Sequence, residues 1–291
     1  MTLNYSIGSS HLVVKGECAI PFMRLIPGFS FFNVATENST RHQFTVDFGN
    51  CLQLPKCHIL HEFPFDNDQM SCSFAKSGDD YFVLISDLHH ASAPFVMKYS
   101  GGDSVVASLP TNPSVLRFAL WMAYAMMAAK YDLTLIHSSV VVCPEGAVLV
   151  LGESGTGKST HTRLWLENIP NTFLLNDDSP VLSVEEGTPF VYGSPWSGKT
   201  PCYVPRKEPL LAVVRLSQAP ENHISLLSGV QSFISLQPSC PPALAYDSTF
   251  TDYIFSLITQ VIKAVPVFHL SCLPNPEAAL LCYNTIMAHH K

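Results

Sequence analysis

The sequence has little charge and no basic stripe. Only 13% of its 291 residues are charged, and the formal net charge is −7. A nucleic-acid-binding surface needs clustered Lys and Arg, so we expect no nucleic acid among the partners. Hydrophobic residues make up 47% of the chain, which predicts a folded protein with a substantial core rather than a disordered one.

The cysteines lack the spacing of a disulfide framework or a zinc site. There are nine, an odd number, and no Cys-x-x-Cys occurs. Cys57, His58 and His61 lie close together in sequence, but no second cluster completes a set of zinc ligands. Free cysteines, buried as small hydrophobic residues in a reducing compartment, are the better interpretation.

The sequence also lacks a long apolar run. The longest, Phe118–Ala129, is bracketed by Arg117 and Lys130 and falls short of the roughly 20 residues that span a bilayer. The first residues show no basic region followed by an apolar stretch, so we expect no signal peptide. These observations predict a soluble, cytoplasmic protein with no membrane partner.

Residues 1–110 have the pattern of a β-rich accessory region. Two hairpins are legible from turn residues between apolar runs. They are Met70–Lys76 with Tyr81–Ser86, and Pro94–Tyr99 with Ser104–Leu109. Nothing in this region suggests catalysis. A buried helix is expected within residues 111–132, over Pro113–Tyr131 with Asn112 as its N-cap, and it would connect the two halves.

From residue 133 to 291, strands alternate with helices, as is typical of an α/β layer. We assign this part to a nucleotide-binding domain for the reasons given below. The predicted strands are Leu133–Val142, Ala147–Leu151, Thr172–Leu175, Pro209–Leu216 and Val265–Leu270, and the predicted helices are Ser159–Asn168, Ser228–Leu236, Thr249–Lys263 and Pro276–Ala288.

A phosphate-loop motif, G-x4-G-K-[ST], lies between an expected strand and an expected helix. Its glycines let successive N–H groups face an anion, and the helix start adds further donors. The lysine supplies a charge for the phosphates and the serine a hydroxyl for Mg²⁺. We therefore expect ATP with Mg²⁺ as cofactor, bound by Gly152, Glu153, Ser154, Gly155, Thr156, Gly157, Lys158, Ser159 and Thr160.

A second literal match, Gly193–Thr200, lacks the required context. Pro195 removes an N–H from the loop, and Pro201 stands where a helix would begin. It is therefore no second phosphate loop. Lys199 remains a candidate cation for the nucleotide or the acceptor, with Trp196 lining the site. The alternative is a proline-rich turn with Trp196 buried.

Asp177 and Asp178 follow the strand after the loop helix, so we expect them at the nucleotide end of the sheet. One carboxylate would hold Mg²⁺, directly or through water, and the other would accept a proton from the attacking hydroxyl. The alternative is an Asx turn before Pro180.

His137 is placed by counting. If residues 143–146 form a four-residue hairpin loop, Val142 pairs with Ala147 and His137 lies opposite Gly152. It could there bond a catalytic carboxylate or a phosphate oxygen. The alternative is a structural histidine, because a one-residue slip in register reverses the side chain.

Residues 133–182 resemble the catalytic domain of the HPr kinase/phosphorylase family, whose core is shared with phosphoenolpyruvate carboxykinases. The resemblance implies an α/β (α+β) phosphate-loop core with a mixed sheet, here preceded by a smaller β-rich region. It also implies phosphate and metal binding by Lys158 and Ser159, proton acceptance by Asp178 and assistance from His137.

The chain departs from that family at one metal-binding segment. Where the family has a Leu-Glu-Ile-Arg-Gly type sequence, residues 190–193 read Phe-Val-Tyr-Gly without an acid. This argues against the phosphorylase reaction and against HPr itself as the substrate. Arg206, Lys207 and Arg215 are candidates for a missing cationic role.

The residues favour a kinase that acts on a serine-like hydroxyl of a protein or a small metabolite. A nucleotide-binding regulatory module without chemistry is the alternative. Carboxykinase chemistry is less favoured, since the chain is short and lacks a set of arginines for a dicarboxylate. The acceptor, the choice between ATP and GTP, and the oligomeric state stay open, a homo-oligomer being one option.

Overall fold

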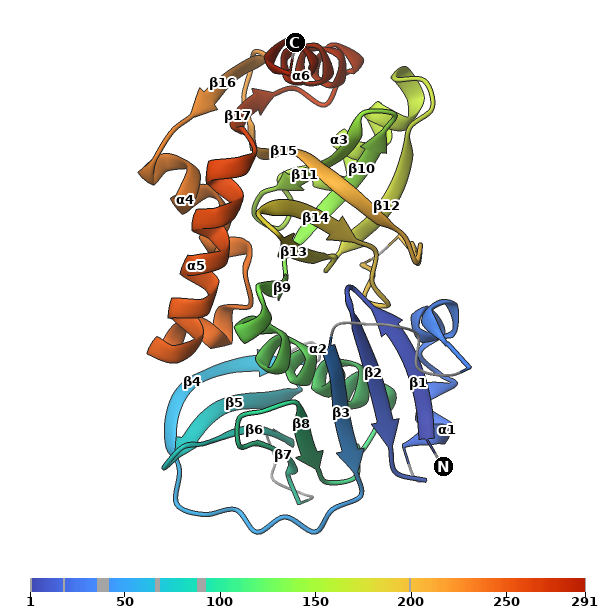
Figure 1. Cartoon of the computed structure of the whole chain (residues 1–291), viewed down its shortest axis with the longest axis vertical. Helices are drawn as coiled ribbons and strands as arrows, with labels where there is room; N and C mark the ends of the chain where they lie inside the picture. The colour runs from blue at the N-terminus through green and yellow to red at the C-terminus, as the bar shows by residue number, and fades with distance from the viewer. Residues whose placement is uncertain are drawn as a thin grey trace. The chain divides into compact units, whose positions relative to one another are not determined.

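The computed structural model describes residues 2–17, 19–35, 42–65, 69–87, 93–198 and 200–290. The chain forms two compact units, Met1–Lys130 with Ala243–Thr251, and Tyr131–Pro242 with Asp252–Lys291 (Figure 1). The helix expected to connect the halves thus lies within the first unit up to Lys130. The segment Ala243–Thr251, which the sequence grouped with the nucleotide-binding half, belongs to the first unit as well.

The first unit is built on an eight-stranded mixed sheet. Its two parallel pairs are β2–β3 and β3–β8, and its other pairs are antiparallel. Both predicted hairpins are present, as β5–β6 and β7–β8. In sheet order the strands are β1 (Thr2–Ile7), β2 (Ser10–Lys15), β3 (His42–Phe48), β8 (Ser104–Ala107), β7 (Phe95–Tyr99), β6 (Asp80–Asp87), β5 (Met70–Ser77) and β4 (His58–Phe65).

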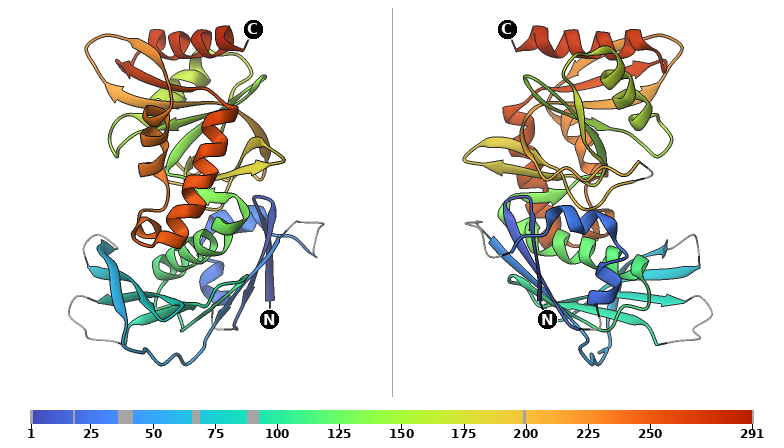
Figure 2. Two further views of the ribbon diagram at one scale, coloured as in Figure 1. Left: turned by 60° about the vertical axis from the view of Figure 1, so that its left-hand side comes forward. Right: turned by 90° about the vertical axis from the view of Figure 1, so that its right-hand side faces the viewer.

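Helix α2 (Pro113–Ala128) packs against β3 and β7 of this sheet (Figure 2). Its Asn112 cap accepts a hydrogen bond from the Val115 N–H at 2.9 Å, as the sequence predicted, and a 3-10 turn continues the helix over Ala129–Tyr131. Most of its side chains are buried, because the helix has almost no polar face. The unit also holds α1 (Ile20–Met23) and a 3-10 helix at Pro27–Phe32.

The second unit is built on a nine-stranded mixed sheet, in which β11–β15 and β15–β17 are parallel and the remaining pairs antiparallel. The chain is thus a mixed α/β protein with mixed sheets. The strands run β12 (Phe173–Asp178), β10 (Ser138–Cys143), β11 (Gly146–Leu151), β15 (Lys207–Gln218), β14 (Thr188–Tyr192), β13 (Val181–Glu185) and β9 (Leu133–Leu135), with β17 (Val267–Cys272) beside β15 and β16 (His223–Leu227) beside β17.

Two predictions about these strands were wrong. Leu133–Val142 is not one strand: it breaks at Ile136 and His137, whose N–H groups donate to Pro180 and Ser239. The strand predicted to end at Leu175 continues through both aspartates to Asp178. Strands β13, β14 and β16 have no counterpart in the sequence prediction.

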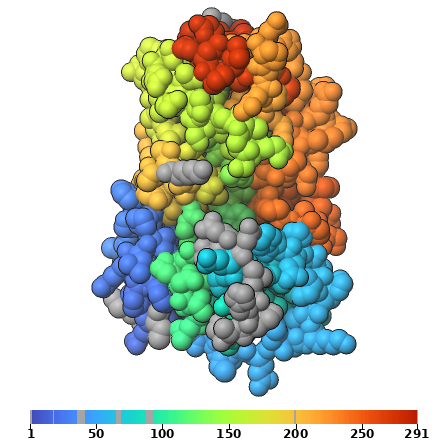
Figure 3. All heavy atoms as spheres, turned by 180° about the vertical axis from the view of Figure 1, so that it is seen from behind, coloured from blue at the N-terminus to red at the C-terminus, as the bar shows by residue number. Residues whose placement is uncertain are grey.

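One face of this sheet is covered by α3 (Lys158–Asn168) and α6 (Pro276–His289), which contact each other and lie side by side on the surface in Figure 3. Trp165 of α3 and Cys282 of α6 are fully buried in the core that they share with β11 and β15. The unit also contains α4 (Val230–Leu236), and α5 (Ser248–Ala264) begins in the segment assigned to the first unit. Within the described ranges, no helix combines the length and apolar character needed to cross a membrane.

Candidate functional site

The phosphate-loop motif has the strand–loop–helix context expected from the sequence. Strand β11 ends at Leu151, and α3 begins at Lys158. Gly157 caps α3 in the left-handed region, at a φ of +101°, where an L side chain would be strained. At Gly152 a Cβ would lie 2.5 Å from the Thr156 hydroxyl oxygen. The glycines therefore permit the tight curl that turns N–H groups toward a common centre.

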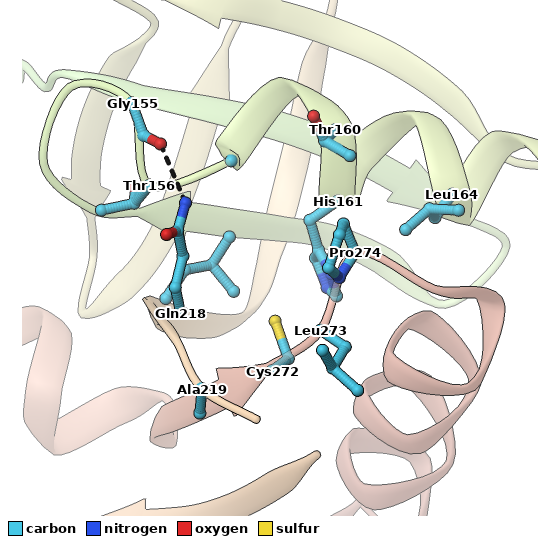
Figure 4. Close-up of a pocket in the computed structure, with 12 residues that line it drawn as sticks. Gly155, Thr156, Thr160, His161, Leu164, Gln218, Ala219, Cys272, Leu273 and Pro274 are labelled. Carbon is cyan, nitrogen blue, oxygen red and sulfur yellow. Dashed lines mark hydrogen bonds between the residues drawn. The ribbon is translucent and has the colours of Figure 1, made fainter. Parts of the chain in front are cut away.

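Side chains hold the loop in this curl. The Thr156 hydroxyl donates to the Glu153 carbonyl at 2.8 Å. From β15, the Gln218 amide donates to the Gly155 carbonyl at 3.2 Å, the dashed contact in Figure 4. Both bonds use loop carbonyls, and the Thr156 N–H also donates to the Glu153 carbonyl, at 3.3 Å.

The Lys158 ammonium lies against the loop. It donates to the Gly152 carbonyl at 2.8 Å and to the Glu153 carbonyl at 3.2 Å, and its third contact is His137 Nε2 at 3.1 Å. Burial lowers the pKa of Lys158, while the carboxylates of Asp177 and Asp178 offset part of the shift. A phosphate group at this point would stabilise the charged form in the same way.

The two aspartates lie at the loop and contact different partners. The Ser159 hydroxyl donates to Asp177 Oδ1 at 3.1 Å. Asp178 Oδ1 lies 3.3 Å from His137 Nδ1. The nominated residues thus form two sets at the loop, Ser159 with Asp177, and Lys158 with His137 and Asp178.

Asn176, which the sequence analysis did not nominate, fixes the position of the acid pair. It is fully buried, and its Oδ1 accepts from the N–H groups of Asp178 and Ser179, both at 3.0 Å. Its amide nitrogen donates to the Ser194 and Trp196 carbonyls. The Asx turn weighed as an alternative is therefore made by Asn176, and the aspartate side chains make the contacts with Ser159 and His137.

His137 reaches the site by a different route from the one predicted. The expected register is present, with Val142 paired to Ala147, but the ladder ends at Ser139 opposite Val150. His137 lies in the break between β9 and β10, and its side chain is 51% exposed. Nε2 lies 3.1 Å from the Lys158 ammonium, which can only donate, so Nε2 is the acceptor there, and Nδ1 lies 3.3 Å from Asp178 Oδ1.

The second motif match has no phosphate-loop geometry. Its backbone pairs with the end of β12: the Gly198 N–H donates to the Asp177 carbonyl at 3.2 Å, and Ser197 bridges Asp178. Trp196 is 1% exposed, so it is a buried residue of the turn, and the idea that it lines the site was wrong. Lys199 lies outside the described residues.

Of the three candidate cations, Arg215 lies at the loop. It is the β15 partner of Leu151, and its guanidinium binds the Glu153 carboxylate at 2.9 Å and the Ser235 carbonyl at 3.1 Å. Arg206 instead pairs with Glu208, and Lys207 pairs with Glu185. The parallel register of β11 and β15 is the signal that would have selected Arg215 and Gln218.

A cavity of about 620 Å³ opens beside the loop (Figure 4). It is lined by the loop, α3, the end of β15 and the segment after β17, through Gly155, Thr156, Gly157, Thr160, His161, Leu164, Leu216, Gln218, Ala219, Cys272, Leu273 and Pro274. A smaller hollow has a volume of about 250 Å³, and its lining includes Ser159, Asp177, Arg163 and Thr200.

The residues at the loop suit Mg²⁺ as a nucleotide-bound ion. Mg²⁺ takes oxygen ligands and usually keeps water and phosphate with only one or two protein ligands. Ser159 and Asp177 offer a hydroxyl and a carboxylate 3.1 Å apart. Across the described residues, no group of three or more His, Cys, Asp or Glu side chains comes together as a ligand set.

No family model and no curated protein matches the sequence. Among solved structures, the chain is similar to the Hpr(Ser) kinase/phosphatase from Coxiella burnetii at 12% identity and a TM-score of 0.30, over 54% of this chain and 90% of that one. A TM-score this low does not show a shared fold or function. The function proposed below is therefore based on the chain's own residues.

Proposed function

We propose that the chain is an ATP- and Mg²⁺-dependent phosphotransferase of the HPr kinase-like type, moving a γ-phosphoryl group to a hydroxyl of a protein or a small metabolite. One observation carries the proposal. Lys158, Ser159, Asp177, Asp178 and His137 come from three separate segments and meet at the phosphate loop, where Lys158 contacts His137, His137 contacts Asp178, and Ser159 contacts Asp177.

The loop and Lys158 would bind the phosphates. Loop N–H groups and the first turn of α3 present donors and a positive dipole end to an anion. Lys158 now donates to two loop carbonyls, contacts that it can exchange for phosphate oxygens without moving its main chain. Mg²⁺, held by Ser159 and Asp177, would neutralise charge on the phosphates.

Asp178 would act as the proton acceptor. In the transfer, the acceptor oxygen forms a bond to the γ-phosphorus, the bond from that phosphorus to the bridging oxygen breaks, and ADP leaves. The acceptor's proton passes to a carboxylate oxygen of Asp178. The His137 Nδ1–H, 3.3 Å from Asp178, would orient that carboxylate and stabilise its charge.

A nucleotide-binding regulatory module is the second candidate function. Two observations favour it: β14 supplies no acid at Phe190–Tyr192, and Glu153 holds Arg215 in an ion pair at the loop. Such a module would bind MgATP without turnover. Carboxykinase-type chemistry is less favoured, because the chain is short for it and its sequence shows no set of arginines suited to a dicarboxylate.

Transfer of label from [γ-³²P]ATP into extract of the source organism tests the proposal. We expect label in protein or in the small-molecule fraction with wild type, and a loss of at least about 100-fold with Lys158→Ala, in line with the loss of a catalytic cation. Lys207→Ala, which removes a lysine paired with Glu185, is the matched control. Bound ATP without Lys158-dependent label would favour the regulatory module instead.

A further inference from the structure

His161 is a buried histidine with one ring nitrogen unpaired. It lies on α3 and is 3% exposed. The Trp165 indole N–H donates to His161 Nε2 at 3.1 Å. His161 Nδ1 has no hydrogen-bond partner among the described residues.

The protonation state of this ring follows from its surroundings. Because Nε2 accepts the indole N–H, it carries no proton. A neutral imidazole keeps one proton, which must then be on Nδ1. The protein therefore contains a buried N–H donor without an acceptor, an arrangement that is unfavourable unless a ligand completes it.

His161 lines the cavity beside the phosphate loop. Figure 4 shows the His161 side chain directed from α3 toward Pro274, which lines the same cavity. Leu164, Leu216 and Leu273 make much of the remaining wall apolar, and its lining contains no Asp, Glu, Lys or Arg. The cavity also includes loop residues Gly155–Gly157, so an occupant would be continuous with phosphates bound at the loop.

We propose that this cavity is the nucleobase pocket and that His161 Nδ1–H donates to a ring nitrogen of adenine. The inference rests on the proposed nucleotide binding. A flat, uncharged heteroaromatic ring suits the apolar walls, and its in-plane nitrogen lone pairs are the acceptors that the donor lacks. Guanine suits the pocket less well, since its N1–H and exocyclic amine are donors and no carboxylate lines the cavity to accept them.

Binding measurements can separate the base from the phosphates. Calorimetric titrations would compare MgATP, magnesium tripolyphosphate, and the 1-deaza, 3-deaza and 7-deaza analogues of ATP, each with one ring nitrogen replaced by C–H. With wild type, we expect MgATP to bind more tightly than tripolyphosphate. One of the deaza analogues should bind about fivefold to tenfold more weakly than ATP, as loss of one buried hydrogen bond requires.

The variant His161→Phe keeps a flat ring but removes Nδ1–H. We expect its affinity for tripolyphosphate to match wild type, and the difference between ATP and the sensitive analogue to disappear. His223→Phe, which changes an exposed histidine of β16 outside the cavity, should keep that difference. The comparison of analogues on wild type stands by itself if His161→Phe does not fold.

The outcomes distinguish this inference from the proposed function. If tripolyphosphate binds and ATP gains nothing over it, or if all three analogues bind like ATP, the base pocket is elsewhere and the inference is overturned. The same follows if His161→Phe folds and still discriminates the sensitive analogue. If neither tripolyphosphate nor ATP binds, the proposed function itself fails.

Discussion

Contacts between individual side chains hold the residues around Lys158 in place. Its ammonium contacts His137, which in turn contacts Asp178, while the neighbouring Ser159 contacts Asp177. Each contact fixes the position of a polar side chain at the loop, where His137 remains half exposed. Lys158, with its lowered pKa, and the two nearby carboxylates are together suited to bind a metal ion and a phosphate group.

His161 should make the stability of the protein depend on pH. Its native pKa of about 4 lies below the ordinary value of 6.5. As the pH falls below 6.5, the unfolded chain binds a proton that the native ring does not accept until about pH 4. Stability is therefore present above pH 6.5 and is lost between these values, by about 2–3 kcal/mol.

Denaturant unfolding at pH 7 and pH 4.5 measures this loss. His161→Phe should remove most of that pH dependence relative to wild type, whereas His223→Phe, at an exposed position, should leave it unchanged. An equal pH dependence in wild type and His161→Phe would contradict the buried, neutral state of the ring.

The sequence predicted the residues whose placement depends on local pattern. The phosphate loop follows from its spacing, and the Val142–Ala147 register follows from a four-residue turn. Asn176 and Gln218 were not nominated as part of the site, and Arg215 was only one of three candidate cations, because their partners are groups far away in sequence. Those pairings depend on which strands become neighbours, and hydrophobic periodicity does not encode that order.

At the scale of elements, β12 and residues 193–198 act together. The Gly198 N–H bonds the Asp177 carbonyl, and Asn176 ties the same strand to Ser194. A proline-rich segment is thus used as a support for the acid pair. The sequence analysis did not predict this role. It compared the segment with a phosphate-loop motif, and the prolines indicated only that no helix follows.

Gly198→Ala should disturb Mg²⁺ binding. A Cβ at this position would lie 2.7 Å from the Asp177 carbonyl oxygen, so the strand end must shift and the Asp177 carboxylate moves with it. We expect the gain in ATP affinity on adding Mg²⁺ to fall by about tenfold, the usual effect of disturbing a metal ligand's support. Affinity for ATP in EDTA should stay near that of wild type.

Gly187→Ala is the matched control. It makes the same chemical change at a left-handed position, in the turn between β13 and β14, where a Cβ meets nothing within 4 Å. This variant should lose stability but keep the full effect of Mg²⁺. Equal Mg²⁺ effects in both variants and wild type would show that Asp177 does not serve the metal.

At the scale of the whole molecule, the segment Ala243–Thr251 belongs to the first unit although second-unit residues flank it on both sides. Asp247, on this segment, is buried and accepts from Lys76 at 2.8 Å and from Tyr81 at 2.9 Å. Burial raises the pKa of Asp247, but the bonds from Lys76 and Tyr81 more than offset this and lower it overall. No sequence pattern predicted that the segment Ala243–Thr251 joins the first unit, because Asp247 is far from Lys76 and Tyr81 in sequence.

Asp247→Asn should destabilise the first unit by about 2 kcal/mol, less than a fully buried pair because Lys76 is partly exposed. Asp80→Asn, which breaks the more exposed pair with Lys98, should cost less than about 1 kcal/mol. Chemical denaturation of both variants at pH 7 checks the difference. Equal losses would mean that the Asp247 contacts do not secure the segment.

The most direct test of the central claim is to measure binding and transfer in the same Asp178→Asn sample. The substitution keeps size and shape but removes the proton acceptor. The proposed phosphotransferase predicts MgATP affinity within about twofold of wild type and label transfer slower by about 100-fold or more, the range for loss of a general base. Transfer at the wild-type rate with a folded Asp178→Asn protein would contradict the role of Asp178 and the mechanism built on it.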